Sequence, residues 1–131
     1  MNLNRALFRL PLALALVAAG HAQAAKGELL EIAWSAGGSF AHETKVGPGR
    51  FLEVCGKLPS GVAIQWQFEA RRPMDFNIHF HEGKDVRYPA RQSAVAKAAD
   101  TFTTPVEQDY CWLWSNKSSV EVTISMSLQR R

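Results

Sequence analysis

Residues 74–81, with the sequence Met-Asp-Phe-Asn-Ile-His-Phe-His, alternate strictly between apolar and polar side chains. Side chains on a β-strand point to opposite faces in turn, so the pattern predicts a strand with one dry face and one wet face. The dry face, which we expect to join a hydrophobic core, consists of Met74, Phe76, Ile78 and Phe80. The wet face carries four groups that form hydrogen bonds or ligate metals, namely Asp75, Asn77, His79 and His81.

Segments of similar character recur along the chain with turn residues between them, which favours an all-β fold. We expect strands at 28–34, 40–46, 50–57, 62–69, 74–81, 85–88, 100–103, 109–114 and 119–128. Arg72-Pro73 and Glu82-Gly83-Lys84 are interpreted as turns, and the alanine-rich stretch 90–99 as a long connection. The sequence therefore predicts an antiparallel β-sandwich of about eight strands.

Residues 1–24 have the form of a signal peptide. Arg5 and Arg9 precede and enter an apolar run through Leu10–Ala19, and residues 22–24 have the small-x-small form of a cleavage site. We expect cleavage after Ala24, which leaves residues 25–131 as one soluble domain in the periplasm or outside the cell. The apolar run is too short to span a bilayer and no second one follows, so no membrane span is expected.

Cleavage would change the charge balance that the full chain suggests. The 131 residues contain 15 Lys and Arg against 12 Asp and Glu, a net charge of +3. Arg5 and Arg9 leave with the signal peptide, so 13 basic residues remain against the same 12 acidic ones. This nearly neutral balance gives no electrostatic support for nucleic-acid binding.

Cys55 and Cys111 are the two cysteines of the chain. Two thiols in an exported protein usually pair, so we expect one disulfide. The chain-entropy model assigns a loop of this length about 4 kcal/mol of stability. The alternative is a thiolate metal site, which the wide separation and the lack of a CxxC or CxH motif disfavour.

The order of features from Cys55 onward is distinctive. Cys55 is followed by the turn 58–61, the strand 62–69, Asp75-Phe76-Asn77-Ile78, Tyr88-Pro89, Thr101-Phe102-Thr103 and the segment 109–116. This order resembles the GOLD (Golgi dynamics) domain, a β-sandwich of eukaryotic cargo receptors, lipid-transfer proteins and adaptors. The resemblance implies a non-catalytic binding module and makes Cys55 and Cys111 the equivalents of that family's disulfide. The resemblance is to a GOLD domain that lacks the coiled coil and transmembrane helix of the cargo receptors.

His79 and His81 leave the same face of their predicted strand, with Cβ atoms about 7 Å apart. A His-x-His pair on a strand is a recurrent way to bind Cu(II) or Zn(II). Candidate further ligands are Asp75 first, and then Asn77, Glu82 and His42. The other interpretation is that a polar stripe solvates one side of a sheet. The pair also resembles the cupin motif, but the later cupin ligands are missing from this sequence.

Tyr110, Trp112 and Trp114 alternate with Cys111 and Leu113, so the three aromatic side chains share one face of a predicted strand. If Cys111 points toward the core, this row faces outward and becomes a candidate contact for a protein or small ligand. The alternative places the aromatic row in the core. The other candidate binding surface is the polar face of residues 74–81, which includes Asn77.

Signatures of catalysis are not visible in the sequence. It contains no Gly-x-Ser-x-Gly, no His-Glu-x-x-His and no glycine-rich phosphate loop. Asn116-Lys117-Ser118 is interpreted as a turn between the last two strands. We therefore expect a binding module rather than an enzyme, with an unidentified protein or small ligand as partner and copper or zinc binding as the alternative function.

Overall fold

The computed structural model describes residues 26–131, and the expected signal peptide at 1–24 lies outside these described residues. Within the described range the chain forms seven strands: β1 Glu28–Glu31, β2 Ser39–Val46, β3 Phe51–Leu58, β4 Ala63–Glu82, β5 Asp85–Thr103, β6 Gln108–Ser115 and β7 Val122–Arg130. The same range has no helix with the length and hydropathy that a bilayer crossing requires. The predicted all-β class is confirmed.

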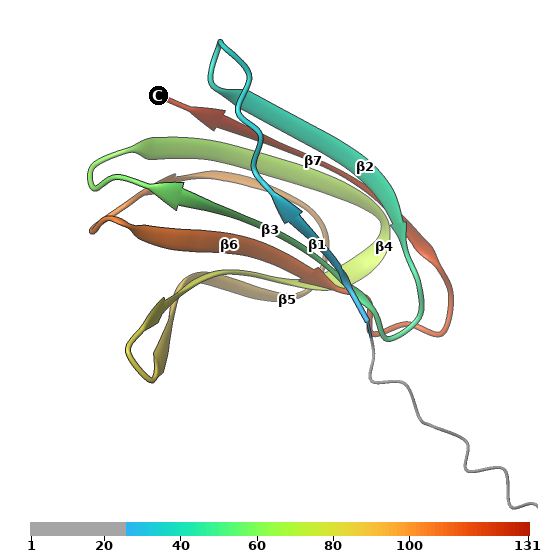
Figure 1. The fold of residues 1–131 in the computed structure, drawn as a ribbon. Coiled ribbons are helices and arrows are strands. Elements are labelled where there is room, and N and C mark those ends of the chain that lie inside the picture. Colours follow the sequence, from blue (N-terminus) through green and yellow to red (C-terminus); the bar gives the residue numbers. More distant parts are fainter. Residues whose placement is uncertain (1–25) are drawn as a thin grey trace, which may run out of the picture.

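The seven strands form one continuous sheet that curls into a half-barrel (Figure 1). The strand order is β1-β3-β6-β4-β7-β2, and β5 pairs with β4. Neighbouring strands are antiparallel except β1 and β3, which run parallel. The expected sandwich is therefore not confirmed, because the curled sheet stays connected through β4.

Strand β4 joins the two halves of the sheet. Its first part pairs with β7 from Ile64 to Ala70, and its second part pairs with β6 from Asp75 to His79. The turn predicted at Arg72-Pro73 is wrong, since β4 continues through it with a register irregularity, where a proline is tolerated. We call β2, β7 and the first part of β4 the β7 half, and β1, β3, β6 and the second part of β4 the β6 half.

Strand β5 also merges two predicted segments. Residues 90–99 were expected to connect strands, but Ala90 pairs with Ile78 and Ala98 pairs with Phe68. Pairing with the whole length of β4 overrides the weak strand propensity of alanine. Ala94, at a φ of 52°, marks the place where the ladder is irregular. The two mergers reduce nine predicted segments to seven strands.

The inner face of the curled sheet holds the hydrophobic core. The apolar residues of 74–80 are all buried, with Ile78 at 0% exposure and Phe80 at 6%. The predicted dry face is therefore confirmed. The first part of β4 contributes Ile64, Trp66 and Phe68 to the same core.

The aromatic row of β6 faces this core, so the interpretation of an exposed aromatic patch is wrong. Tyr110 and Trp112 are fully buried and Trp114 is 1% exposed. The Trp114 ring lies 5.4 Å from that of Phe76 on the neighbouring strand. The physical reason is that Cys111 points outward to meet its partner on β3, and alternation then turns the aromatic side chains inward.

Asn116 fixes the connection between β6 and β7. It is fully buried, and its side-chain N–H groups donate to the carbonyls of Val46, at 2.9 Å, and Val120, at 2.7 Å. Its side-chain oxygen accepts the backbone N–H of Ser118 at 2.9 Å. The amide therefore closes a turn on the end of β2, in agreement with the turn predicted there.

Candidate functional site on the outer face

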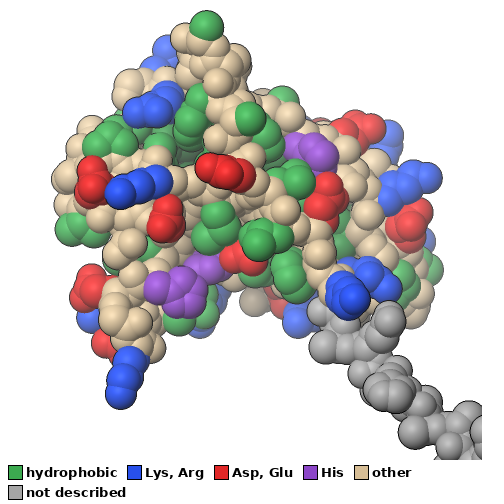
Figure 2. Space-filling model, viewed as in Figure 1, with side chains coloured by type: hydrophobic (Ala, Val, Ile, Leu, Met, Phe, Trp, Pro, Cys, Tyr) green, Lys and Arg blue, Asp and Glu red, His purple; other side chains and the backbone are tan. Residues whose placement is uncertain are grey.

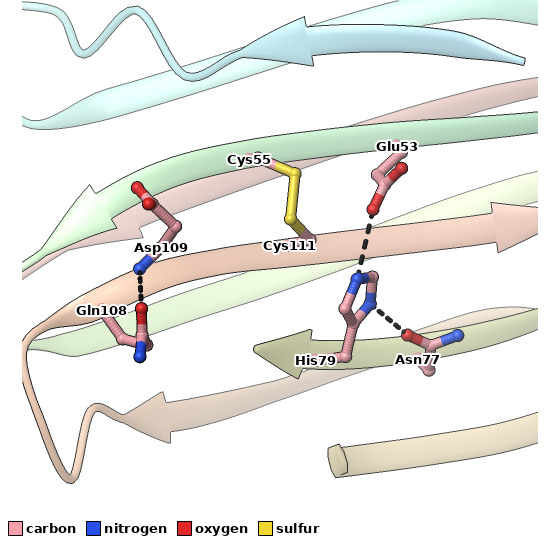
Figure 3. The surroundings of a disulfide bond; sticks show 7 residues. All are labelled: Glu53, Cys55, Asn77, His79, Gln108, Asp109 and Cys111. Atoms are coloured by element: carbon pink, nitrogen blue, oxygen red, sulfur yellow. Dashed lines mark hydrogen bonds and ion pairs between the residues drawn. A yellow bond between two sulfur atoms is a disulfide. The ribbon is translucent and has the colours of Figure 1, made fainter. Parts of the chain in front are cut away.

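The predicted disulfide is confirmed on the outer face of the β6 half. Cys55 of β3 and Cys111 of β6 are directly opposite in the antiparallel register, and their sulfur atoms are 2.05 Å apart. Figure 3 shows the bridge lying across the two strands, with Glu53 and His79 beside it. Cys55 is partly exposed, whereas Cys111 is buried.

His79 lies at the centre of a polar cluster next to this bridge (Figure 3). It is opposite Cys111 in the β4–β6 register. Its Nε2 is 3.2 Å from a carboxylate oxygen of Glu53, and its Nδ1 is 2.8 Å from the side-chain oxygen of Asn77. We call Glu53, Cys55, Asn77, His79 and Cys111 the outer cluster.

The orientation of the Asn77 amide assigns the tautomer of His79. With the side-chain oxygen facing the ring, Nδ1 donates the hydrogen bond and carries the hydrogen. Burial lowers the pKa of His79, the Glu53 carboxylate acts in the opposite direction, and His81 lowers it further. Burial thus favours the neutral ring, whose Nε2 lone pair faces the Glu53 carboxylate. A proton or another cation between these two atoms would relieve their repulsion.

The other histidines and Asp75 have different surroundings. His81 is exposed, and its ring centroid lies 5.6 Å from that of His79. The Asp75 carboxylate accepts the backbone N–H of Ala94 at 3.0 Å. His42 lies on β2, with its Nε2 3.1 Å from a carboxylate oxygen of Glu28. Metal binding by His79, His81 and Asp75 therefore stays a prediction.

Glu53 is the member of the cluster that sequence reasoning missed. It occupies one polar position in the alternating strand 51–58, two residues before Cys55, and so shares its face. The available signal was the disulfide itself, which sets Cys55 opposite Cys111 and brings Glu53 to the neighbourhood of His79.

A second group of side chains lies on the outer face of the β4–β5 hairpin, which projects at the lower left of Figure 1. The guanidinium carbon of Arg91 is 3.7 Å from the centroid of the Tyr88 ring, and that ring is 6.1 Å from the His79 ring. Tyr88 is 44% exposed and Val86, opposite His81, is 37% exposed. We call His81, Val86, Tyr88 and Arg91 the hairpin strip. Histidine and charged side chains surface at this end of the molecule (Figure 2).

Comparisons with known proteins find similar structures but no match by sequence. No protein-family model matches the chain, so the resemblance to the GOLD family gains no support, and no curated protein matches significantly. A periplasmic inhibitor of g-type lysozyme, PliG from Aeromonas hydrophila, superposes with a TM-score of 0.64 at 13% identity, covering 82% of this chain and 100% of that one. PliG from Salmonella Typhimurium gives 0.56 at 12% identity, covering 79% and 98%.

The pre-peptidase C-terminal domain of a Bacillus anthracis collagenase has the same kind of fold. Its TM-score is 0.59 at 11% identity, with coverage of 82% of this chain and 98% of that one. At such identities the likeness establishes a shared all-β fold.

Proposed function

We propose that this protein is an exported, non-catalytic module that binds another protein through the hairpin strip. Tyrosine and arginine are the residue types that contribute most to protein interfaces, and Val86 adds exposed apolar area beside them. The PliG structures of the same fold are named as inhibitors of g-type lysozyme, which makes a protein partner the first class to consider.

The observation that carries this proposal is the stack of Arg91 on the exposed ring of Tyr88. The stack holds two long side chains in place before any partner arrives, so less conformational entropy is lost on binding. The His79 ring lies 6.1 Å from the Tyr88 ring and is itself held by a hydrogen bond to Asn77 of β4. A rigid aromatic and cationic surface on a projecting hairpin fits a partner with an acidic or polar recess.

The test begins with a g-type lysozyme as probe. We expect the purified protein to inhibit the enzyme and to bind it in a calorimeter, and Tyr88→Ala or Arg91→Ala to weaken binding at least about tenfold, or 1.4 kcal/mol. Gln67→Ala is the matched control, because Gln67 is an exposed polar residue on the outer face of the β7 half.

A photo-crosslinker at position 88 extends the test to other partners. It should capture one protein from a periplasmic extract, while the same group at position 67 captures none. Unchanged binding by a Tyr88→Ala/Arg91→Ala variant, or equal capture at both positions, would contradict the proposed surface.

A second candidate function is copper or zinc binding by His79 and His81 with Asp75. The adjacent imidazole rings, 5.6 Å apart between centroids, favour it. Calorimetric titration of the disulfide-bonded protein with Cu(II) or Zn(II) should then give micromolar binding that His81→Ala removes and Asp75→Asn weakens less. Affinity should fall as imidazole becomes protonated. Binding unchanged by His81→Ala would exclude this site.

A further inference from the structure

The outer cluster contains two cysteines that offer no thiolate to a metal ion while they form a disulfide. Ligand atoms of Glu53, His79 and Cys111 all lie within 4.8 Å of one another. The sulfur of Cys55 lies outside this group, but its bond to the Cys111 sulfur makes it a direct neighbour of the group. Metal ions take cysteine as thiolate, and a disulfide offers none.

We propose that reduction of the Cys55–Cys111 disulfide converts the outer cluster into a zinc site with Cys55, Cys111, His79 and Glu53 as ligands. Two thiolates, one imidazole and one carboxylate form a four-coordinate set that suits Zn²⁺. The site contains no residue of the hairpin strip. It shares His79 with the His79, His81 and Asp75 candidate, but it requires the cysteines and does without His81.

The distance between the nitrogen and oxygen ligands fits tetrahedral coordination. Nitrogen and oxygen ligands about 2.0–2.1 Å from zinc lie about 3.3 Å from each other at a tetrahedral angle. The Nε2 of His79 and the carboxylate oxygen of Glu53 are 3.2 Å apart. A zinc ion between them would also replace the repulsion of lone pair and carboxylate by two favourable bonds.

The surroundings prepare His79 for this role. Zinc-binding histidines usually donate their other ring N–H to a fixed acceptor, which orients the ring. Asn77 is that acceptor here, at 2.8 Å. The ligands come from the neighbouring strands β3, β6 and β4, whose pairing holds them in place.

A reductant can reach the bridge from one side. A hollow of about 410 Å³ on the outer face is lined by Leu29, Cys55, Gly56, Lys57 and Asp109 among others. At this hollow Leu29 is 67% exposed and Cys55 is partly exposed. Cys111, the other half of the disulfide, is buried. A protein dithiol is the class of reductant that such a surface would admit.

The chemical step balances in two stages. A thiolate of the dithiol attacks the Cys55 sulfur, the bond between the two cysteines breaks, and its electron pair leaves on Cys111 as a thiolate beside His79. The second thiol of the reductant then attacks the mixed disulfide and releases Cys55, so the reductant becomes a disulfide. Two electrons and two protons pass to the protein. Zn²⁺ displaces the two thiol protons and ties β3 to β6 again.

The experiment compares the oxidised protein with protein reduced by a phosphine, using Co(II) as a spectroscopic probe and Zn(II) in competition with a chromophoric chelator. Only the reduced protein should show the thiolate-to-cobalt charge-transfer band and the visible bands of tetrahedral Co(II), and zinc should abolish both. Zinc affinity should be at least about 100-fold higher after reduction. Zinc should also raise the melting temperature of the reduced protein.

Three variants retain the disulfide and can therefore be purified folded before reduction. His79→Ala and Glu53→Gln should weaken zinc binding by the reduced protein, and Asn77→Ala should weaken it about tenfold or more through loss of ring orientation. His81→Ala is the control and should leave the reduced site unchanged, in contrast to its effect on the oxidised candidate site.

Several results would overturn the proposal. They are equal metal affinity before and after reduction, a cobalt spectrum without thiolate bands, full affinity in the reduced His79→Ala variant, or a reduced protein that zinc does not stabilise. None of these results bears on partner binding by the hairpin strip, which is measured on the oxidised protein.

Discussion

The two halves of the sheet have similar inner faces and very different outer faces. In the β7 half, Gln65, Gln67 and Glu69 of β4 lie exposed beside Ser125 of β7. In the β6 half, Asp75 and Asn77 of the same strand are partly buried, and His79 is 8% exposed. One alternating pattern therefore yields a solvated surface in one half and a connected polar cluster in the other.

The difference comes from what lies on either side of β4. In the β7 half the neighbouring outward positions include Ala99 and Ser127, which are too small to cover the strand and leave an open hollow. In the β6 half the disulfide and the Tyr88 ring flank His79. A polar group that is buried without a hydrogen-bond partner lowers the stability of the protein. Burial in the β6 half therefore favours hydrogen bonds between the polar side chains there.

The largest effect should come from the inner face, where the halves are alike. Phe68→Asp in the β7 half and Phe76→Asp in the β6 half each bury an unpaired charge, and each should cost more than about 4 kcal/mol of unfolding free energy. Urea denaturation followed by circular dichroism measures this, with the exposed Gln67→Asp as control. A stable Phe68→Asp protein would show that the two inner faces are not equivalent.

Loss of the disulfide should affect the β6 half next most strongly. The bridge joins residues separated by 56 positions, and its removal in a Cys55→Ser/Cys111→Ser variant should cost about 4 kcal/mol in metal-free buffer. Hydrogen exchange should show the loss of protection concentrated in β3 and β6. Uniform loss across both halves would mean that the sheet unfolds as one unit.

Asn116 tests the connection between the halves. Asn116→Ala leaves the carbonyls of Val46 and Val120 without their donor and should cost about 2 kcal/mol. Ser118→Ala, which removes a more exposed partner of the same turn, should cost less. Thermal unfolding of both variants checks the order, and a larger cost for Ser118→Ala would contradict it.

Two alanine substitutions compare the outer faces of the β6 half and the β7 half. His79→Ala removes a buried ring with two polar partners and should cost about 1–2 kcal/mol, whereas Gln67→Ala should stay within about 0.5 kcal/mol. If the polar stripe only solvated one side of the sheet, as one interpretation of the sequence has it, His79→Ala would cost little. Equal stability of the two variants would restore that interpretation.

The smallest effect should appear in the dependence of stability on pH. Burial lowers the pKa of His79 below 6.5, so the unfolded chain binds its proton at a higher pH than the folded protein does. Stability should therefore fall as the pH drops from about 6.5 toward the folded pKa. Urea unfolding in the presence of a chelator should show this slope in the wild type and a shallower one in His79→Gln.

Local pattern predicted a large part of the site. The alternation of 74–81 placed His79 and Asn77 on one face, and the two cysteines together with the expected signal peptide predicted the bridge. The local pattern did not identify Glu53 as a member of the outer cluster, because a glutamate at a polar position of an alternating strand has the same pattern as a solvent-exposed residue. The spacing of Cys55 and Cys111 argued against a thiolate metal site, but spacing along the chain does not report distance across paired strands.

The sequence by itself determined the all-β class, the alternation of side chains along each strand and the disulfide, because period-two alternation and thiol pairing are local or compositional properties. Only the tertiary structure decided that β4 and β5 run unbroken through 71–73 and 90–99, because long-range backbone pairing outweighs the propensity of alanine or proline. The tertiary structure also decided that the Trp112 side chain points into the core and that His79 is buried. Alternation separates two faces of a strand, but which face meets the core depends on how the sheet curls.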